Sequence, residues 1–356
     1  MAGSVRRQGG GDRRVGRQDV ARAAGVSVTT VTHALNPPPG VRMDPATRER
    51  VRRVAQDLGY RPSFVGRALV SGRSFTVGLL QPTRATLLYP FYQSITFGLS
   101  EAMEAADYLP LVLFRSPEGR HLRVIRQGRV DGMLVLQSER DDAPIREVAA
   151  MGVPTVAVNV HYGPGAGEVA GSVHSDHRRM MLEVIAELVG LGCRTLLAIH
   201  DYRSHDANAT LHDTFVQETA RLAGQGAVGS ALIPVAENPR EQFRSLFQSG
   251  QRWDGFFVDG TRVAEVLVAE GLAAGLVPGR DYHLVTAETE PGRMTSGRWE
   301  LAVYCHQAEE VGRAAWRLLA DLIDGRTPCR EVLIPYRREA VKQSSGAAAV
   351  LPQKGT

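Results

Sequence analysis

Cysteine and long apolar runs are both scarce in this chain. Only three cysteines occur among 356 residues, Cys193, Cys305 and Cys329, and their spacing matches no zinc-binding pattern. Three thiols are too few for a disulfide scaffold, which is consistent with a reducing compartment. No apolar run reaches the ~18 residues of a membrane span, and the Arg- and Gly-rich amino terminus lacks the apolar stretch of a signal peptide. We therefore expect a soluble, cytoplasmic protein that makes no contact with a membrane.

Recognisable catalytic motifs are also missing. The sequence contains no Gly-x-Ser-x-Gly elbow, no Walker loop and no His-Glu-x-x-His zinc motif. The glycines of residues 163–167 lack the spacing of a dinucleotide-binding loop, and no helical pattern follows them. We therefore expect a protein that is not an enzyme and that carries no cofactor.

Two groups of His and Asp raise metal binding as an alternative. Both groups contain suitable ligand types. Their spacing matches no closed site, however, and Asp176 stands where a helix N-cap is expected, so we expect no metal. The groups are His174, Asp176 and His177, and His200, Asp201, His205 and Asp206.

Lysine is nearly absent, and the arginines that replace it are unevenly distributed. Residues 1–73 carry fourteen Arg and five acidic residues, a net charge of about +9, whereas residues 74–356 carry 28 Arg or Lys and 33 acidic residues, about −5. A basic head on an acidic body indicates nucleic-acid binding, because Arg neutralises phosphates and releases condensed counterions. A disordered basic tail would explain residues 1–16 but not residues 17–62, which have a helical hydrophobic pattern.

The pattern of residues 17–62 is that of a helix-turn-helix domain. An Ala-rich helix at 18–24 precedes Gly25, the residue type that most readily adopts the positive φ of a helix end. Ser27 is placed to cap the next helix, 28–35.

The second helix has an inner and an outer face. Its inner face carries Val31, Ala34 and Leu35 at helical spacing. Its outer face can present hydroxyl, imidazole and methyl groups to base edges and phosphates, through Val28, Thr29, Thr32 and His33.

A third helix completes the head. Residues 36–40 interrupt the chain with three prolines, and Asp44 and Pro45 then supply an N-cap and a first helical residue. The predicted helix runs over residues 45–58, buries Val51, Val54, Ala55 and Leu58, and ends at Gly59. A purely structural three-helix domain is the alternative.

These residues resemble the head of the lactose-repressor (LacI/GalR) family. The resemblance rests on Val20-Ala-x-x-Ala-Gly25-Val-Ser27-x-x-Thr30-Val-Thr32-x-x-Leu35-Asn36, on Thr47-Arg-x-x-Val51 and on Leu58-Gly-Tyr60-x-Pro62. Residues 63–74, with Gly66-Arg67-Ala68-Leu69-Val70-Ser71-Gly72-Arg73, are similar to that family's hinge helix.

The resemblance implies a recognition helix in the major groove of an operator, with Val28 and Thr29 setting operator choice. It also implies that Leu69, one per subunit of a dimer, wedges into the minor groove and kinks the DNA. His33 replaces an Arg that is common in the family. The implied DNA-binding residues are Ser27, Val28, Thr29, Thr30, Thr32, His33, Asn36, Tyr60, Arg67, Leu69 and Arg73.

The body alternates between strand-like and helix-like segments. Strand-like runs occur at residues 76–80, 109–114, 132–136, 155–160, 195–199, 231–235, 255–258 and 283–287, and helical patterns include 93–106, 177–191, 262–274 and 307–323. Alternation of this kind predicts parallel sheets covered on both faces, and the length suits two subdomains.

The family resemblance implies a periplasmic-binding-protein-like core over residues 75–341, formed by two discontinuous subdomains. Under that topology we place the three crossings between subdomains near residues 171, 302 and 331. The tail at 342–356 is polar, lacks a Leu heptad and is expected to be disordered.

A ligand of the body should lie outside the carboxyl ends of the parallel strands. The resemblance adds Phe91 as a residue that stacks on the effector, and Glu288 and Asn159 as its polar contacts. Two departures weaken the case for a hexose: an Arg that clamps hydroxyls aligns with Leu211, and an Asn-Asp pair aligns with Gly260-Thr261. The candidate effector-binding residues are Tyr89, Phe91, Asn159, Asp206, Leu211, Asp259 and Glu288.

The sequence therefore predicts a transcriptional regulator, a repressor that binds a pseudo-palindromic operator as a homodimer under control of a small-molecule effector, which could be a carbohydrate. Three alternatives stay open. They are a solute-binding protein, a constitutive DNA-binding regulator with a degenerate pocket, and an α/β enzyme fused to a DNA-binding head.

Overall fold

The computed structural model describes residues 15–35, 40–61, 64–81, 83–84, 88–136, 143–160, 171–200, 206–224, 229–288, 300–326 and 331–342. The chain divides into two compact units, Met1–Arg73 and Ser74–Thr356. The predicted tail beyond residue 342 and residues 1–14 lie outside the described residues. Within the part of the chain that is described, no helix is long and apolar enough to cross a membrane.

The first unit is all-helical. It contains α1 (Arg17–Ala24), α2 (Val28–Leu35), α3 (Pro45–Asp57) and α4 (Phe64–Ser71). Helices α1 to α3 enclose a small core, whose fully buried residues include Val20, Val31, Ala34 and Val51. Leu58, which the sequence predicts to be buried, is instead 38% exposed, because α3 ends one residue earlier and Leu58 is its C-cap.

The turns of the head follow from three local interactions that the sequence predicts. Gly25 ends α1 with φ of 65°, in the left-handed region that glycine enters without steric cost. The Ser27 hydroxyl accepts a hydrogen bond from the Thr30 backbone N–H at 3.0 Å, and the Asp44 carboxylate accepts one from the Thr47 N–H at 2.9 Å. Each cap satisfies an N–H that a helix start would otherwise leave unpaired.

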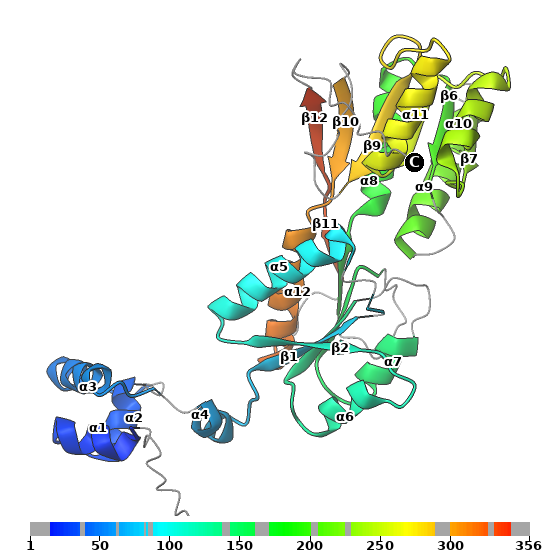
Figure 1. Ribbon diagram of the computed structural model, residues 1–356. Coiled ribbons are helices and arrows are strands. Elements are labelled where there is room, and N and C mark those ends of the chain that lie inside the picture. Colours follow the sequence, from blue (N-terminus) through cyan, green and yellow to red (C-terminus); the bar gives the residue numbers. More distant parts are fainter. Residues whose placement is uncertain are drawn as a thin grey trace, which may run out of the picture. The chain divides into compact units, whose positions relative to one another are not determined.

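The second unit contains two six-stranded sheets (Figure 1). The first sheet has the order β2-β1-β3-β4-β5-β11, and the second has the order β7-β6-β8-β9-β10-β12. The strands are β1 (Thr76–Gln81), β2 (Leu109–Phe114), β3 (Gly132–Leu136), β4 (Thr155–Val158), β5 (Gly171–Ser175), β6 (Thr195–Ile199), β7 (Gly229–Ile233), β8 (Gly255–Asp259), β9 (His283–Glu288), β10 (Glu300–Cys305), β11 (Glu331–Ile334) and β12 (Arg337–Lys342).

Helices cover both faces of each sheet, as buried parallel strands require. The first sheet packs against α5 (Pro90–Ala105) and α12 (Ala308–Ile323) on one side and α6 (Arg120–Arg126) and α7 (Ala143–Ala149) on the other. The second sheet packs against α8 (His177–Gly190) and α9 (Asp206–Ala223), and against α10 (Pro239–Gln248) and α11 (Thr261–Ala273). Neighbouring residues of one strand, such as Phe256 and Phe257, enter opposite cores.

The eight predicted strands are present, and four further strands, β5, β10, β11 and β12, complete the sheets. The predicted parallel sheets are confirmed, and one strand that the sequence did not predict departs from them, because β12 pairs antiparallel to β10. The chain passes between the sheets at Asp176, at His306–Gln307 and at Pro335–Tyr336, each four or five residues after the predicted crossing.

An aspartate anchors the amino edge of each sheet at equivalent positions. The Asp131 carboxylate, just before β3, accepts hydrogen bonds from the backbone N–H groups of Ser74 and Phe75 at 2.7 and 2.8 Å. The Asp254 carboxylate, just before β8, accepts from the N–H groups of Arg194 and Thr195 at 2.8 and 2.7 Å. The two subdomains thus share both a strand order and a device that fixes the start of their first strands.

Helices α5 and α12 approach so closely that two glycines are required between them. A Cβ atom on Gly312 would overlap the carbonyl oxygen of Ile95, and one on Gly98 would overlap the carbonyl oxygen of Glu309. In both cases the obstacle is backbone, which cannot rotate away as a side chain can.

We therefore predict that Gly312→Ala lowers the free energy of unfolding of the second unit by about 3 kcal/mol, the upper end of the usual overpacking penalty. Gly190→Ala is the matched control, because Gly190 ends α8 and has no atom within 4 Å of its Cβ position. That change should be neutral or stabilise by up to about 1 kcal/mol. Urea unfolding of both variants checks the prediction, and equal effects would contradict the close approach of α5 and α12.

Candidate DNA-binding surface and candidate ligand site

The amino-terminal turn of α2 presents two side chains to the outside of the head. Val28 is 41% exposed and Thr29 is also exposed, whereas Val31 and Ala34, one turn further, are fully buried. The cap from Ser27 fixes where this turn begins. The helix therefore holds Val28 and Thr29 in a defined direction.

Two other hydroxyls of this surface are already engaged within the head. The Thr30 hydroxyl lies 2.8 Å from that of Ser27. The Thr32 hydroxyl donates to the Val28 carbonyl oxygen at 3.0 Å and accepts from the Arg17 guanidinium at 3.3 Å. These contacts fix the helix end, and they leave Thr29 as the hydroxyl of α2 best placed to reach another molecule. His33 is partly buried.

Helix α4 carries two adjacent apolar side chains that the protein leaves exposed. Leu69 is 83% exposed and Val70 is 84% exposed. Arg67 and Arg73 come from the same segment, which places basic groups beside the apolar pair. Tyr60 packs against the core of the head, and Asn36 lies outside the described residues.

Several buried polar atoms lack a partner where strands of the first sheet end. Gln81, the last residue of β1, is fully buried, and neither its amide oxygen nor its amide nitrogen is hydrogen-bonded within the described residues. Asn159 follows β4 with φ of +60°, and its Oδ1 is buried with no partner there. Its Nδ2 donates weakly to the Tyr92 hydroxyl at 3.5 Å. Because buried polar atoms are rarely left without a partner, these atoms mark a candidate ligand site.

The corresponding edge of the second sheet carries a carboxylate. Glu288, the last residue of β9, accepts hydrogen bonds from the Thr261 hydroxyl at 2.6 Å and the Thr261 backbone N–H at 3.3 Å, at the start of α11. The Glu288 carbonyl oxygen accepts from the His306 N–H at 2.8 Å.

His306 joins these groups to the three crossings between the sheets. Its ring packs on Phe91, with 4.8 Å between ring centroids. Its Nδ1 lies 3.3 Å from the Ser175 hydroxyl, and its Nε2 lies 3.2 Å from the Tyr336 hydroxyl, which is itself 2.7 Å from His177 Nδ1. We call Ser175, His306, Tyr336 and His177 the crossing network.

The hydrogen bonds of the crossing network constrain one another's direction. The Tyr336 hydroxyl has one proton, so it can donate to only one of the two imidazoles, and the other must donate to it. Burial lowers the pKa of His306 to about 3, so its ring is neutral and has a single N–H. If the His306 ring donates to the Tyr336 hydroxyl, its other nitrogen must accept from the Ser175 hydroxyl. Reversing either of these two hydrogen bonds therefore reverses the other.

The structure distributes the remaining candidate ligand residues unevenly. Asp259 ends β8. Burial raises the pKa of Tyr336, and the charges of Asp259 and Asp176 raise it further. Tyr89 is the N-cap of α5 and is 60% exposed. Asp206 begins α9, and its side chain lies outside the description. Leu211 is 3% exposed and belongs to the apolar core around Met181, so its side chain serves packing.

Asp201 and His205, two members of the groups that raised the metal alternative, lie outside the described residues. Among the described residues, no three His, Cys, Asp or Glu side chains are grouped closely enough to hold a metal ion. His174 instead bonds to Glu331 at 3.2 Å, and Asp176 caps α8 through the Arg179 N–H at 3.0 Å.

His306 and Tyr336 are functional candidates that sequence reasoning misses. Both follow a strand that the pattern did not reveal, and the rule used for Asn159 and Glu288, to inspect the residue after each strand, would have found them. Glu300–Cys305 alternates weakly, and Glu331–Ile334 has only four residues. Gln81 directly follows the predicted strand at 76–80, so the same rule would have found it as well.

Comparison with known proteins now places the chain. Residues 18–63 match the family described as "Bacterial regulatory proteins, lacI family". The HTH-type transcriptional regulator CelR of Thermobifida fusca is 35% identical over 333 residues, which are 88% of this chain and 94% of that protein. The chain belongs to the lacI family of bacterial regulatory proteins.

Other relatives align over shorter stretches. RegA of Clostridium saccharobutylicum is 34% identical and MalR of Streptococcus pneumoniae is 30% identical, but the alignments span only 42% and 46% of those proteins and about two fifths of this chain.

Solved structures share the fold. The lac repressor dimer bound to operator and the anti-inducer ONPF has a TM-score of 0.70 at 18% identity, over 92% of this chain and 98% of that one. The CelR–cellobiose complex has a TM-score of 0.58 at 23% identity, over 94% and 100%.

The pKa of His306 predicts acid sensitivity of the second unit. The folded protein keeps this imidazole neutral down to about pH 3, whereas the unfolded chain protonates it below about 6.5. The unfolded state therefore binds more protons between these values, and stability falls as the pH drops from 6.5 toward 3, by at most about 1.4 kcal/mol per pH unit from this group. His306→Gln should remove this contribution to the pH dependence. The unfolding free energy of the variant, relative to that of the parent, should therefore rise when the pH is lowered from 7.5 to 4.5.

Urea unfolding at the two pH values measures this shift. His283→Gln is the control, because His283 begins β9 and lies outside the crossing network. If both substitutions change the pH dependence equally, His306 is not the responsible group.

Proposed function

We propose that this protein is a sequence-specific DNA-binding transcriptional regulator, a repressor that binds a pseudo-palindromic operator as a dimer and responds to a small molecule bound beside His306. The observation that carries the proposal is the capped start of α2, which presents Val28 and Thr29 from a head with a net charge of about +9. A helix of this size enters the major groove, and the arginines around it contact phosphates. Such a protein works where the chromosome is, which we take to be the cytoplasm.

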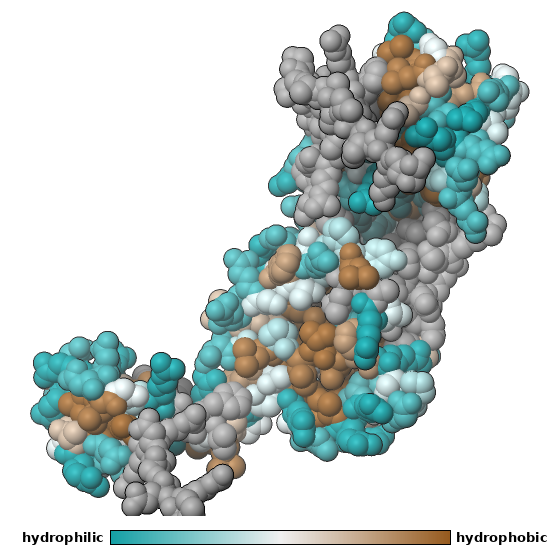
Figure 2. Space-filling view, in the orientation of Figure 1, coloured by the Kyte–Doolittle hydropathy of each residue, from teal (hydrophilic) through white to brown (hydrophobic). Residues whose placement is uncertain are grey.

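Dimerisation is supported by the physics of readout and by the surface. One short helix reads few base pairs, and two-fold symmetry doubles the sequence that is read. Apolar side chains are exposed on the edge strand β2, where Leu109 is 66% and Val112 is 42% exposed, and on α5, where Phe97 is 66% exposed. Hydrophobic residues gather on this subdomain's surface in Figure 2, as expected of a surface that a second copy covers.

The effector that best suits the site is a compact ring compound with several hydroxyl groups, a carbohydrate or a related metabolite. Phe91 offers a flat apolar surface, and Gln81, Asn159 and Glu288 offer amide and carboxylate groups for hydroxyls. The name of the solved CelR–cellobiose complex indicates a sugar ligand in that relative. Because Thr261 already binds Glu288, part of the acceptor capacity is used internally.

The competing functions find less support. A solute-binding protein has no use for the basic helix-turn-helix head, and an enzyme would need a catalytic constellation that neither the motifs nor the crossing network supplies. We therefore propose that the protein is not an enzyme. A constitutive regulator with an unused pocket remains the second candidate, because Leu211 and Gly260 stand at positions that the family resemblance assigned to polar ligand contacts.

Operator choice should change when Thr29 changes. Thr29→Gln should shift the preferred operator by about 1–3 kcal/mol at the affected base pair, because a longer amide reaches a different base edge. Arg67→Gln should instead weaken binding to all sequences about equally and reduce the salt dependence. Selection from random operators, with exposed Gln56→Ala on α3 as control, checks both expectations. An unchanged operator for Thr29→Gln would contradict this assignment of α2.

Effector response and DNA bending should separate by mutation. Phe91→Ala should abolish the effect of the ligand on operator affinity while leaving ligand-free affinity intact. Leu69→Ala should do the reverse, because the exposed Leu69 acts only on DNA. Linkage requires that effector and operator change each other's affinity by the same factor, typically about 5–150-fold. A metabolite screen by thermal shift, followed by operator titration, tests both expectations. If the screen finds no stabilising ligand and the Phe91→Ala protein represses under every carbon source, the constitutive regulator is favoured.

A further inference from the structure

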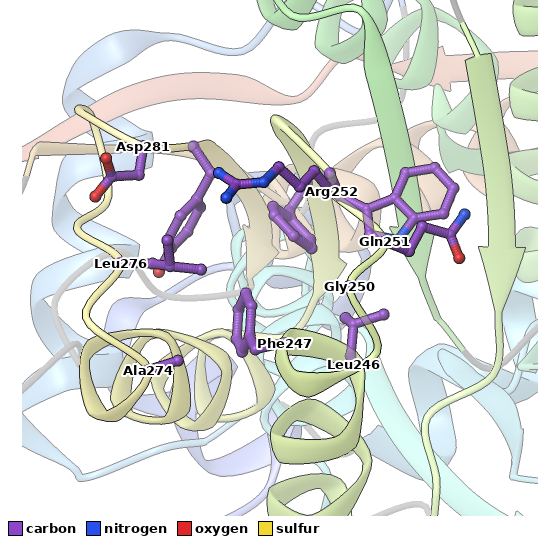
Figure 3. Close-up of a pocket in the computed structure, with 11 residues that line it drawn as sticks. Leu246, Phe247, Gly250, Gln251, Arg252, Ala274, Leu276 and Asp281 are labelled. Atoms are coloured by element: carbon purple, nitrogen blue, oxygen red, sulfur yellow. The ribbon is translucent and has the colours of Figure 1, made fainter.

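A cavity of about 270 Å³ lies in the second subdomain, between the carboxyl-terminal ends of α10 and α11 (Figure 3). It lies at the amino ends of the strands, because Phe256 is near the start of β8 and Tyr282 directly precedes β9. Glu288 ends β9 at the opposite edge of the same sheet. The cavity is therefore separate from the ligand site beside His306.

Three aromatic rings form its inner wall. The ring centroids of Phe256 and Tyr282 are 5.2 Å apart, and Phe247 lies 6.2 Å from Phe256 and 6.1 Å from Tyr282. Figure 3 shows the Phe247 ring between α10 and α11, with Leu276 nearby. A cavity of this size with such walls suits a planar one-ring compound, because drug-sized ligands occupy about 300–1,000 Å³.

Two lining residues carry buried polar atoms without a partner. Tyr282 is 2% exposed, and its hydroxyl has no hydrogen bond within the described residues. The indole Nε1 of Trp253 is buried and also unpaired there. Buried donors are rarely left unpaired in proteins, so these atoms point to a ligand that carries an acceptor.

The charged groups of the pocket are unequally used. The Asp281 carboxylate accepts from the Arg280 guanidinium at 2.7 Å and from the Val277 N–H at 2.7 Å, and these contacts hold the pKa of Asp281 below its usual value. Arg252 is exposed and has no hydrogen bond or ion pair within the described residues, and Figure 3 shows its side chain extending toward Asp281. Among the described residues, the guanidinium of Arg252, whose charge also lowers the pKa of Asp281, and the indole N–H of Trp253 make no hydrogen bond, and both donors favour an anion.

We propose that this pocket binds a small aromatic carboxylate, with its ring against the wall that Phe247, Phe256 and Tyr282 form and its carboxylate on the donors Arg252 and Trp253. The aromatic wall selects the planar apolar body, and the N–H donors of Arg252 and Trp253 select the acid. This site is independent of the proposed effector site and of DNA binding.

Benzoate is the probe for this site, titrated by calorimetry into the full chain. Saturable binding is expected, and benzyl alcohol, which has the ring without the charge, should bind at least about tenfold more weakly. Arg252→Gln should weaken benzoate about tenfold or more, and Trp253→Phe, which keeps an aromatic ring, about threefold or more. Arg221→Gln removes the same charge from α9, outside the pocket, and should leave the affinity unchanged.

Phe91→Ala distinguishes the two ligand sites, since benzoate affinity should survive this change. Absence of saturable benzoate binding, equal affinity in the parent and Arg252→Gln, or loss of binding in Phe91→Ala would each overturn the proposal. The proposal would also be overturned if sedimentation showed self-association that Arg252→Gln abolishes, because the pocket would then hold a side chain of a second copy. Arg252 is exposed, so its substitution should leave urea unfolding as in the parent.

Discussion

The crossing network is the interaction on which the arrangement of the second unit depends. The chain passes between the two sheets three times, and Ser175, His306 and Tyr336 come from the three passages, one each. Two backbone-directed bonds strengthen this junction, from the Asp176 N–H to the Ile334 carbonyl oxygen and from the Gln307 side chain to that of Pro335, both at 2.8 Å. Together these hydrogen bonds connect the three passages to one another.

The same junction contacts two of the proposed ligand residues, Phe91 and Glu288. Phe91 packs on the His306 ring, and the His306 backbone N–H donates to the carbonyl oxygen of Glu288, so residues from both subdomains contact one histidine. A ligand that displaces Phe91 or draws on Glu288 therefore acts directly on a residue that connects the three passages. Since His306 and Tyr336 can reverse their hydrogen bonds only together, the junction allows two hydrogen-bonding patterns.

Local signals predicted much of this structure, and long-range pairing accounts for what they missed. Gly25, Ser27, Asp44 and Asp176 act where the sequence places them, because a cap is decided by the few residues around it. The missed strands are late partners: β11 pairs with β5, some 160 residues earlier, and no local pattern encodes such pairing. Missing β10 and β11 also hid His306 and Tyr336. Leu211 was a candidate ligand residue from the family resemblance, but its side chain lies in the apolar core. That position depends on helix packing, which a sequence alignment does not contain.

The antiparallel direction of β12 follows from how the chain crosses. After β5 and after β10 the chain leaves the carboxyl edge of one sheet and travels along α8 or α12, of 14 and 16 residues, to the amino edge of the other, so the next strand runs parallel to its neighbours. Only Pro335 and Tyr336 separate β11 from β12, which is too short for a return along a helix. The last strand must then enter the second sheet at its carboxyl edge and run backwards along β10. This reversal keeps Tyr336 at the edge where Asp259, Glu288 and His306 lie, so the one exception to parallel topology supplies the hydroxyl that joins the two imidazoles.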